Sequence, residues 1–574
     1  MSLAAQQSLE SHYVMHTFGR SPVEFVEGHG MKLTGDDGRE YLDFLAGIGV
    51  CSLGHGDPAV LSALEAQTKK LMHVSNYFYI EQRGQVAALL SKLANDDVDG
   101  ARVLADAIVA GDETTAAALG APATDEQVWE TFFANSGAEA NEGSMKLARL
   151  YAKRAGNGGN TIVCMRGGFH GRTLETIAAT MQDWLQDSFH PLPGGFVACT
   201  PNDIDELRAI FKQLGGEICA VMLEPIQGES GVHPMTEEFM AAARDLAHEV
   251  GAVLIADEVQ CGIFRCGKPF AFQAYGVEPD IMSLAKGIAD GVPMGAVVAK
   301  KEIADVFKSG DHGSTFGGSC LAIAACAATL SALVRGDYAD HAAKVGAYME
   351  AKLAKLPNVT EVRGRGLMLG CDLDDTAGDA HDVVARALGA GAVINATGAH
   401  TLRFLPPLVC EEDILNGKGT MKHLTMLEET ARVIESTADC AIGYTAAQMV
   451  LKGLDGFKED FMEHILHNRC RSNLDQPVPC VALCPAGVDI PGYIALTGEG
   501  RYADAVRLIR KDNPFPTACA LVCEHPCESR CRRNMLDNSI NIRGIKRVAV
   551  DMAGYVPAPV CPTSTGKRIA IIGG

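Results

Sequence analysis

The chain has 574 residues and a formal net charge of −21, from 50 Lys and Arg against 71 Asp and Glu. The length predicts about three or four domains, and the acidic balance argues against nucleic acid or an anionic membrane surface as the main partner. The sequence has no apolar run that could span a bilayer and no signal-peptide pattern, so we expect a cytoplasmic protein.

The first predicted elements are short strands within residues 1–60. They are interrupted by the tetrapeptide Gly-Asp-Asp-Gly at residues 35–38, which is typical of a hairpin turn. Further along, residues 98–127 are rich in Ala, Asp and Thr, the kind of insertion that surface loops tolerate. We assign no chemistry to that segment.

A phosphate-binding turn is the next candidate feature. The sequence predicts a strand at Thr131–Ala134, a turn at Asn135–Gly137 and a helix after it. Backbone N–H groups at a helix N-terminus, reached through small residues, bind phosphate with help from the helix dipole. Such turns are common, so this one alone is weak evidence.

Two further predicted strands lead into polar segments. Thr161–Met165 precedes RGGFHGRTLET, and Ile218–Leu223 precedes EPIQGESGVHP. The guanidinium of Arg172 in the first segment has the forked geometry that pairs with a carboxylate. Arg172 could equally form a surface ion pair, and Phe169 could belong to the core.

The strongest candidates follow two buried strands. The apolar run Ala252–Ala256 ends at Asp257, and Ile281–Ala285 ends at Lys286 and a glycine-rich loop. Ligands bind at such carboxyl ends in open α/β sheets. A lysine among apolar residues and glycines is partly desolvated and can bond covalently to a carbonyl. Pyridoxal phosphate requires that lysine together with a carboxylate at its ring nitrogen. Taken singly, Asp257 could be a helix cap and Lys286 a surface lysine.

The segments DEVQCGIFRCGK and LAKGIADGVPMGA resemble the class III, fold type I aminotransferases over residues 10–410, most closely the acetylornithine branch. The resemblance implies an α/β fold with a large, mostly parallel sheet domain and a small α/β domain. It also implies pyridoxal 5'-phosphate as cofactor and a homodimer with a shared active site. We therefore expect a transaminase that acts on an acylated diamino acid and on 2-oxoglutarate or glutamate.

The resemblance also assigns roles to individual residues. Lys286 and Asp257 are the implied catalytic pair, and His170 is taken as structural. The implied cofactor contacts are Gly137, Ala138, Phe169, Asp257, Glu258, Val259, Gln260, Lys286 and Thr315. The implied substrate contacts are Arg172, Ser314, Glu229 and Arg403.

The amino donor is predicted from the segment Leu71–Gln82, LMHVSNYFYIEQ, which resembles the acetylornithine branch. Without the surrounding motifs, its aromatic residues would be interpreted as packing under a loop. Ornithine, succinylornithine and aminobutyrate aminotransferases remain alternatives. Two departures from the family pattern are Ser319-Cys320 in place of Asn-Pro and Phe18 in place of Tyr. The pair Glu229 and Arg403 could also be an ordinary interdomain salt bridge.

The C-terminal part resembles the N-terminal iron–sulfur domain of the glutamate synthase small subunit and of dihydropyrimidine dehydrogenase. Its cysteines recur at four-residue spacing, as [4Fe–4S] ligands do, whereas closed zinc sites more often use Cys-x-x-Cys pairs. Asn473 replaces a family cysteine, and Lys546 lies near the position of a family Glu or Gln. The implied metal ligands are Cys470, Cys480, Cys484, Cys519, Cys523, Cys527 and Cys531.

These observations predict six segments. Residues 1–60 and 331–410 form the small domain, 61–330 the large cofactor domain with the 98–127 insertion, 411–460 a helical linker, 461–562 a mainly α-helical iron–sulfur domain, and 563–574 the start of a dinucleotide-binding domain. We expect a fused or truncated reading frame. A rival from another class is an electron-transfer or docking protein in which the aminotransferase half is a scaffold.

Overall fold

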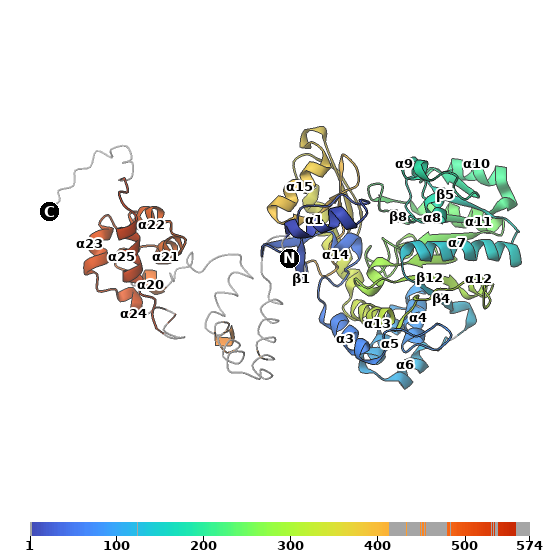
Figure 1. The fold of residues 1–574 in the computed structure, drawn as a ribbon, viewed down its shortest axis with the longest axis horizontal. Helices are drawn as coiled ribbons and strands as arrows, with labels where there is room; N and C mark the ends of the chain where they lie inside the picture. Colours follow the sequence, from blue (N-terminus) through green and yellow to red (C-terminus); the bar gives the residue numbers. More distant parts are fainter. Residues whose placement is uncertain are drawn as a thin grey trace. The chain divides into compact units, whose positions relative to one another are not determined.

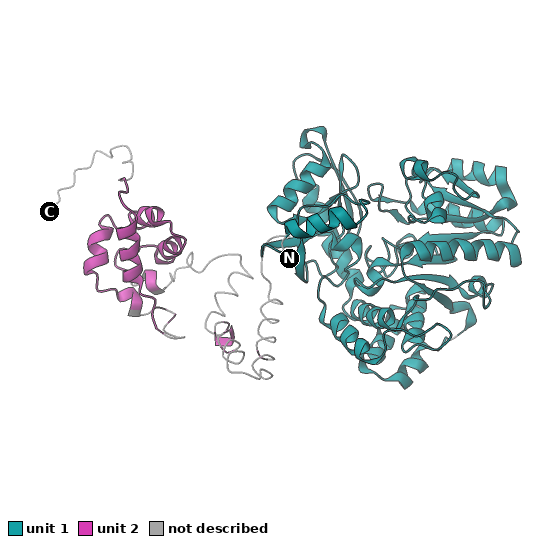
Figure 2. Ribbon diagram, viewed as in Figure 1, with its two compact units in different colours: residues 1–415 teal, residues 416–574 magenta. Residues whose placement is uncertain are grey.

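The computed structural model describes residues 3–122, 124–411, 479–482, 484–529, 531, 533 and 538–557, together with isolated positions between 432 and 454. The chain divides into two compact units, residues 1–415 and 416–574 (Figures 1 and 2). Cys470 and most of the predicted linker lie outside the described residues, as does the predicted dinucleotide-binding start.

A seven-stranded sheet forms the centre of the first unit. β12 runs in the opposite direction to the other six strands, which are parallel to one another, and this confirms the predicted, mostly parallel sheet. In spatial order the strands are β4 (Trp129–Ala134), β12 (Gly295–Lys300), β11 (Ile281–Leu284), β10 (Val253–Asp257), β7 (Ile218–Leu223), β5 (Thr161–Met165) and β6 (Phe196–Cys199).

Both faces of this sheet are covered by helices. Alternate residues of a strand point to opposite faces, so Ile255 packs with the side chains of α7 while Leu254 packs in the core that contains α11 and α13. The helices of the unit are α1 (Leu3–Tyr13), α2 (Ala46–Gly49), α3 (Pro58–Lys70), α4 (Arg83–Ala94), α5 (Val98–Ala110), α6 (Glu113–Gly120), α7 (Gly137–Arg154), α8 (Leu174–Ala179), α9 (Asp183–Gln186), α10 (Ile204–Leu214), α11 (Glu237–Glu249), α12 (Lys301–Ala304), α13 (Cys320–Arg335), α14 (Tyr338–Leu353) and α15 (Ala380–Ala390).

Two smaller sheets join the beginning and the end of the unit. The turn at residues 35–38 connects β2 to β3 as predicted, and β3 pairs in parallel with β15. The first small sheet contains β1 (Phe25–His29), β2 (Lys32–Gly35), β3 (Glu40–Asp43) and β15 (Ala392–Val393). The second contains β13 (Val359–Arg365), β14 (Met368–Leu373), β17 (Thr401–Phe404) and β16 (Asn395–Ala396), and β8 (Ile226–Gln227) pairs with β9 (His233–Pro234).

The segment 98–127 is mainly helical, which differs from the surface loop expected from its composition. Asp97 caps α5 and Asp112 caps α6 through their side-chain oxygens. One face of α5, including Leu104 and Ile108, is buried in the core that also contains α4 and α13. Ala-rich stretches have high helix propensity, and here apolar residues at helical spacing stabilise the helix by packing against the core.

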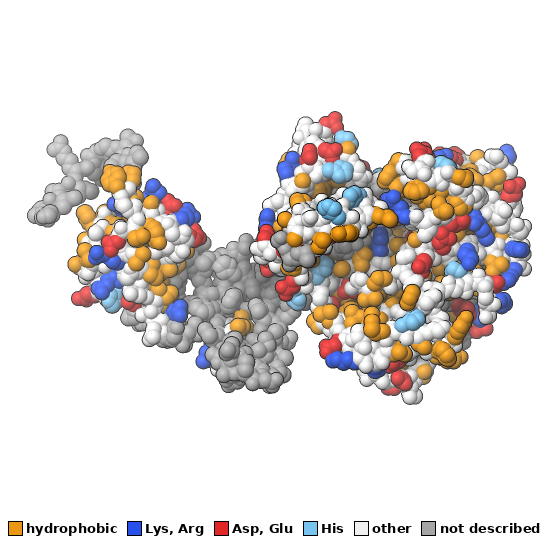
Figure 3. Space-filling view, in the orientation of Figure 1, with side chains coloured by type: hydrophobic (Ala, Val, Ile, Leu, Met, Phe, Trp, Pro, Cys, Tyr) orange, Lys and Arg blue, Asp and Glu red, His pale blue; other side chains and the backbone are white. Residues whose placement is uncertain are grey.

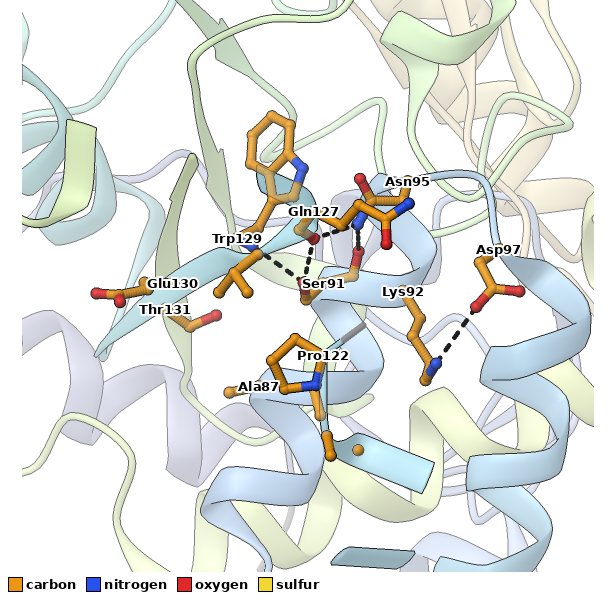
Figure 4. A pocket seen from close by; sticks show the side chains of 14 residues that line it. Ala87, Ser91, Lys92, Asn95, Asp97, Pro122, Gln127, Trp129, Glu130 and Thr131 are labelled. Atoms are coloured by element: carbon orange, nitrogen blue, oxygen red, sulfur yellow. Dashed lines mark hydrogen bonds and ion pairs between the residues drawn. The ribbon is translucent and has the colours of Figure 1, made fainter. Parts of the chain in front are cut away.

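A cavity of about 590 Å³ lies between α4, residues 120–122 and the edge strand β4 (Figure 4). The Ser91 hydroxyl accepts a hydrogen bond from the backbone N–H of Trp129 at 3.0 Å, which ties α4 to the strand. Lys92 forms an ion pair with Asp97 at 3.3 Å on the other side of the cavity. The segment 98–127 therefore borders the free edge of the central sheet.

The second unit is helical, as predicted for the cysteine-rich region. Its helices are α20 (Pro479–Ala482), α21 (Ile490–Gly498), α22 (Tyr502–Ile509), α23 (Pro516–Val522), α24 (Pro526–Ser529) and α25 (Ile542–Met552). They enclose their own apolar core, which includes Val488, Ile490 and Ile509. Apolar side chains such as Val522 and Tyr555 remain exposed, and Figure 3 shows many on the face in view.

Across the described residues, no single helix is long and apolar enough to cross a membrane; only α13 and α14 taken together, bent by 68°, reach that length and composition.

Candidate active site

A cavity of about 490 Å³ opens at the carboxyl ends of the central strands. Asp257 is the last residue of β10, and Lys286 follows the neighbouring β11 after one residue. The cavity brings together most of the residues singled out from the sequence, namely Gly137, Ala138, Phe169, Arg172, Asp257, Val259, Gln260 and Lys286.

Three donors surround the buried carboxylate of Asp257. Its Oδ2 atom accepts hydrogen bonds from Asn141 Nδ2 and His170 Nδ1, each at 2.7 Å, and its Oδ1 atom accepts one from the Val259 amide at 3.0 Å. Burial opposes a charged His170, but the bond to Asp257 and its negative charge raise the pKa of the imidazole. These hydrogen bonds hold the Asp257 carboxylate in one orientation.

Lys286 has an unusual backbone and an unusual environment. Its φ of 51° lies in the left-handed region, which costs energy for any residue other than glycine. Burial lowers the pKa of the Lys286 amine, while the charges of Glu229, Glu224 and Asp257 partly oppose that shift. The neutral amine is consequently more accessible than in an exposed lysine.

The first turn of α7 forms the phosphate end of the cavity. Ser136 caps this helix of 18 residues, and the first amides of a helix have no partner within it. A Cβ atom at Gly137 would lie 2.7 Å from Cγ1 of Val259, closer than side chains pack. The turn thus offers backbone N–H groups to an anion at a point where only glycine fits.

Arg172 lies at the exposed rim of the cavity. Its guanidinium carbon is 5.5 Å from the ring centroid of Phe169 and 6.0 Å from that of Trp184, distances at which a cation interacts with an aromatic ring. Trp184 is 70% exposed and lies in the short helix α9. Two aromatic rings therefore hold the cation at the entrance.

Glu229 and Arg403 form an ion pair behind Gln260. Arg403 is 1% exposed, and its Nη1 atom donates to Oε1 of Glu229 at 2.7 Å and to Oε1 of Gln260 at 3.0 Å. Burial opposes ionisation of Glu229, but Arg403 and then Lys286 hold the pKa of its carboxyl below the usual value. The buried guanidinium is thus neutralised by a carboxylate that remains partly accessible.

Glu258 does not line the cavity, although it was expected to contact the cofactor. Its two carboxylate oxygens accept hydrogen bonds from the backbone amides of Ala271 and Phe272, both at 2.8 Å. The chain turns after Asp257, so the neighbouring acids point in different directions. Burial raises the pKa of the Glu258 carboxyl to about 7.

Ser314 and Thr315 also lie outside this cavity, beside a second hollow next to β4. Ser314 Oγ accepts from Asn135 Nδ2 at 3.0 Å, and Thr315 is exposed. Asn76 donates to the carbonyls of Ser314 and Gly317, at 2.8 and 3.0 Å, which joins this loop to the aromatic segment, residues 71–82.

The aromatic segment does not pack beneath a loop. Tyr77, Phe78 and Tyr79 are all exposed, and so is Phe316 in the adjoining loop. Phe18, at the position where the family often has tyrosine, is exposed as well and does not line the cavity. The segment and the loop together present an aromatic face.

Asn141 and Glu224 are polar residues of the cavity that the sequence did not single out. Glu224 accepts hydrogen bonds from the amides of Phe169 and Gly228, at 2.8 and 3.1 Å, and burial raises the pKa of its carboxyl. The segment EPIQGESG at the end of a buried strand was a usable signal for Glu224. Asn141 lies 116 residues from Asp257, and its contact required the fold.

The described residues fit pyridoxal phosphate. The glycine turn at the start of α7 suits a phosphate, Asp257 suits a protonated ring nitrogen, and the desolvated Lys286 amine suits an aldehyde.

The C-terminal unit brings its cysteines together from two segments. The side chains of Cys480 and Cys484 pack against the core that contains Cys527, and the backbone N–H of His525 donates to Cys523 Sγ at 3.4 Å. Cys519 lies in α23, and Cys531 is buried. Within the described residues these thiols form no disulfide, and no three metal-binding side chains converge on a single ion.

Family models match both units. Residues 14–424 match "Aminotransferase class-III", and residues 458–556 match "Dihydropyrimidine dehydrogenase domain II, 4Fe-4S cluster". Residues 409–464 match "NADH-ubiquinone oxidoreductase-F iron-sulfur binding region". The cysteine-rich unit is therefore related to iron–sulfur domains.

Known proteins resemble the first unit over most of their own length. The acetylornithine aminotransferase of Methanocaldococcus jannaschii is 42% identical over 410 residues, which cover 71% of this chain and 94% of that protein. The crystal structure of acetylornithine aminotransferase from Elizabethkingia anophelis superposes with a TM-score of 0.58 at 29% identity and covers 72% of this chain and 97% of that one. Ornithine aminotransferase from Toxoplasma gondii superposes with a TM-score of 0.63 at 29% identity and covers 72% and 92%.

These matches and the cavity agree with each other, and the chain belongs to the class III aminotransferases, which are pyridoxal-phosphate-dependent transaminases.

Proposed function

We propose that this transaminase transfers the 5-amino group of N2-acetyl-L-ornithine to 2-oxoglutarate. The donor becomes the corresponding aldehyde, and 2-oxoglutarate becomes L-glutamate. The observation that carries the proposal is the buried pair of Glu229 and Arg403 beside the cavity, combined with Arg172 at its rim. The identity of 42% to a known acetylornithine aminotransferase supports the same donor.

The two arginines suit two substrates of different shape. Arg172 lies at the rim and would bind the carboxylate farthest from the reacting carbon, which is the α-carboxylate of acetylornithine or the γ-carboxylate of 2-oxoglutarate. Arg403 would bind the α-carboxylate of 2-oxoglutarate, next to the reacting carbonyl, once Glu229 moves aside. With an amino donor, Glu229 would stay on Arg403 and cover its charge.

The cofactor supplies the electron sink for the bond broken at the reacting carbon. Lys286 would attach to its aldehyde and, after the donor amine displaces it, would move the proton at that carbon as base and then as acid. The lowered pKa of the Lys286 amine favours its neutral form, which is the form that can accept the proton. Asp257 would keep the proton on the ring nitrogen, and His170 and Asn141 hold Asp257 in position.

The remaining cavity residues would position the cofactor. The amides of Gly137 and Ala138 would bind its phosphate, while Phe169 and Val259 would enclose the ring between them. Gln260 Nε2 donates one hydrogen to Glu229, and its second N–H would donate to the phenolic oxygen.

A shared active site would explain the aromatic face. Thr315 is exposed and outside the cavity of its own chain, and the aromatic segment beside it carries large exposed rings. We propose that two copies pair through this face and that Thr315 then contacts the phosphate of the partner's cofactor. Burial of exposed aromatic residues is a common source of dimer stability.

A comparison of amino donors tests the proposed substrate. At saturating 2-oxoglutarate, kcat/KM should be highest for N2-acetyl-L-ornithine among acetylornithine, ornithine, succinylornithine and 4-aminobutyrate. A clear preference for ornithine or aminobutyrate would contradict the donor but leave the transaminase intact. Lys286→Ala should abolish turnover with every donor, and Lys268→Ala, a lysine outside the cavity, is the matched control.

A spectrum of the enzyme separates this function from the scaffold alternative. L-Glutamate alone should convert the absorbance of the lysine-bound cofactor into that of its amino form. A protein that is supplied with pyridoxal phosphate and shows neither form would favour the electron-transfer role of the cysteine unit.

A further inference from the structure

Lys546 is a buried lysine in the cysteine-rich unit. It lies in the middle of α25 and is only 6% exposed, whereas lysine side chains are almost always at the surface. Nearby side chains of the same unit, such as Ile542 and Ala549, belong to its apolar core. The position of this charge therefore requires an explanation.

Two groups contact the ammonium. Nζ lies 3.7 Å from Cys519 Sγ and 5.5 Å from the ring centroid of Tyr493. Among the side chains that the structure describes, no carboxylate forms an ion pair with Lys546. The Tyr493 hydroxyl donates a hydrogen bond to the backbone carbonyl of Ile542 at 3.3 Å, so the phenol carries its proton and supplies no negative charge.

A buried cation without an anion strongly destabilises a fold. A neutral thiol at Cys519 would compensate only a small part of that cost, because a thiol is a weak acceptor. Thiolates bound to iron and sulfide, by contrast, form a cluster with net negative charge. The cysteines that could hold one belong to the same small unit; they are Cys480, Cys484, Cys519, Cys523, Cys527 and Cys531.

The thiols that could hold such an anion come from two segments of the unit. In the part of the chain that is described, no three ligands converge on a single ion, and helices α20 and α24 nevertheless bring two of the cysteine segments into contact.

We propose that Lys546 is the buried counter-cation of the iron–sulfur cluster in this chain. Its ammonium donates a hydrogen bond to the sulfur of Cys519 and offsets part of the cluster's negative charge. Because charge and hydrogen bonds at the sulfurs set the potential of such clusters, Lys546 raises the reduction potential. In the absence of the cluster, the same charge destabilises the unit.

A redox titration of the full chain tests the effect on potential. The chain is reconstituted anaerobically with iron and sulfide, and the reduced signal is followed by electron paramagnetic resonance. Lys546→Met removes the charge with little change in shape and should shift the midpoint to a more negative potential. Lys546→Arg keeps the positive charge, so its midpoint potential should stay close to that of wild type. Lys511→Met, at an exposed position, should leave the midpoint potential unchanged.

Hydrogen exchange separates the counter-cation from a mere packing residue. In iron-free protein, Lys546→Met should increase the protection of the α25 amides, since it removes an uncompensated buried charge. In the reconstituted protein the same variant should release iron faster than wild type. An unchanged midpoint, a loss of protection in the iron-free state, or a wild-type chain that takes up no iron and sulfide would each overturn the proposal. None of these outcomes depends on transamination.

Discussion

The orientation of Asp257 is set by its immediate neighbours. A buried carboxylate alone would be costly, but donors from Asn141, His170 and Val259 occupy its oxygens. Burial lowers the pKa of the His170 imidazole, but its hydrogen bond to Asp257 and the charge of that group raise the pKa on balance. These contacts fix the orientation in which the Asp257 carboxylate would meet the ring nitrogen.

His55 provides a pH test at the scale of one residue. Its hydrogen bond to Asp43, at 2.8 Å, and the neighbouring Cys51 raise the pKa of its imidazole from 6.5 to about 10. Since the pKa is higher in the folded state, the stabilisation is complete below pH 6.5 and is lost as pH rises toward 10. The ring is partly exposed, so we expect a loss of about 1–2 kcal/mol.

Urea unfolding of the first unit between pH 6 and 10 measures this loss. In His55→Gln the free energy of unfolding should fall less between pH 6 and 10 than in wild type. In His400→Gln, a substitution at an exposed position, it should fall as much as in wild type. If the free energy of unfolding of His55→Gln falls as steeply with pH as that of wild type, His55 contributes no such stabilisation.

The sequence predicted Asp257 and Lys286 correctly as neighbours, because both follow buried parallel strands. It could not distinguish Asp257 from Glu258 in orientation, since that depends on the turn after β10 and on amides in residues 271 and 272. It also treated His170 as merely structural. The contact with Asp257 joins residues 87 apart in the chain, and only the order of strands brings them together.

At the scale of elements, α5 shows why composition alone was misleading. Its apolar residues recur at helical spacing, and Leu104 and Ala105 are completely buried. The helix packs against α13 and α4, which lie below the central sheet in Figure 1. The predicted strands were correct to within two residues because short, continuous apolar runs rich in β-branched side chains are typical of strands buried on both faces.

Leu104→Ala should destabilise the first unit by about 2–5 kcal/mol, the usual cost of removing a buried leucine side chain. Val103→Ala on the same helix should change stability by less than about 0.5 kcal/mol, because Val103 is 52% exposed. Thermal unfolding of both variants measures these changes in stability, and the cofactor spectrum checks that the active site is intact. Equal effects would mean that α5 contributes no core packing.

At the scale of the whole molecule, each unit has a separate apolar core. The aminotransferase unit contains every residue of the proposed chemistry except the contacts expected from a second copy. Because Thr315 and the aromatic face are exposed, the proposed dimer can be tested by enzyme activity as well as by molecular mass.

Subunit complementation tests the shared site. Chains with Lys286→Ala and chains with Thr315→Glu should each be inactive, the second because its carboxylate repels the partner's phosphate. When the two are co-expressed in equal amounts, mixed dimers should contain one intact site, and activity should return to about a quarter of wild type. No recovery, with mixed dimers demonstrated by affinity tags, would exclude a site shared through Thr315.

The position of Trp184 has a practical consequence for protein engineering. The ring stacks on Arg172 at the rim, in a helix of four residues, and it is exposed. Gly137 and Asp257, by contrast, are fixed by tight packing and by hydrogen bonds. A library that varies residue 184 and its neighbours in α9 can therefore reshape the entrance for bulkier acyl groups while the catalytic centre keeps its geometry.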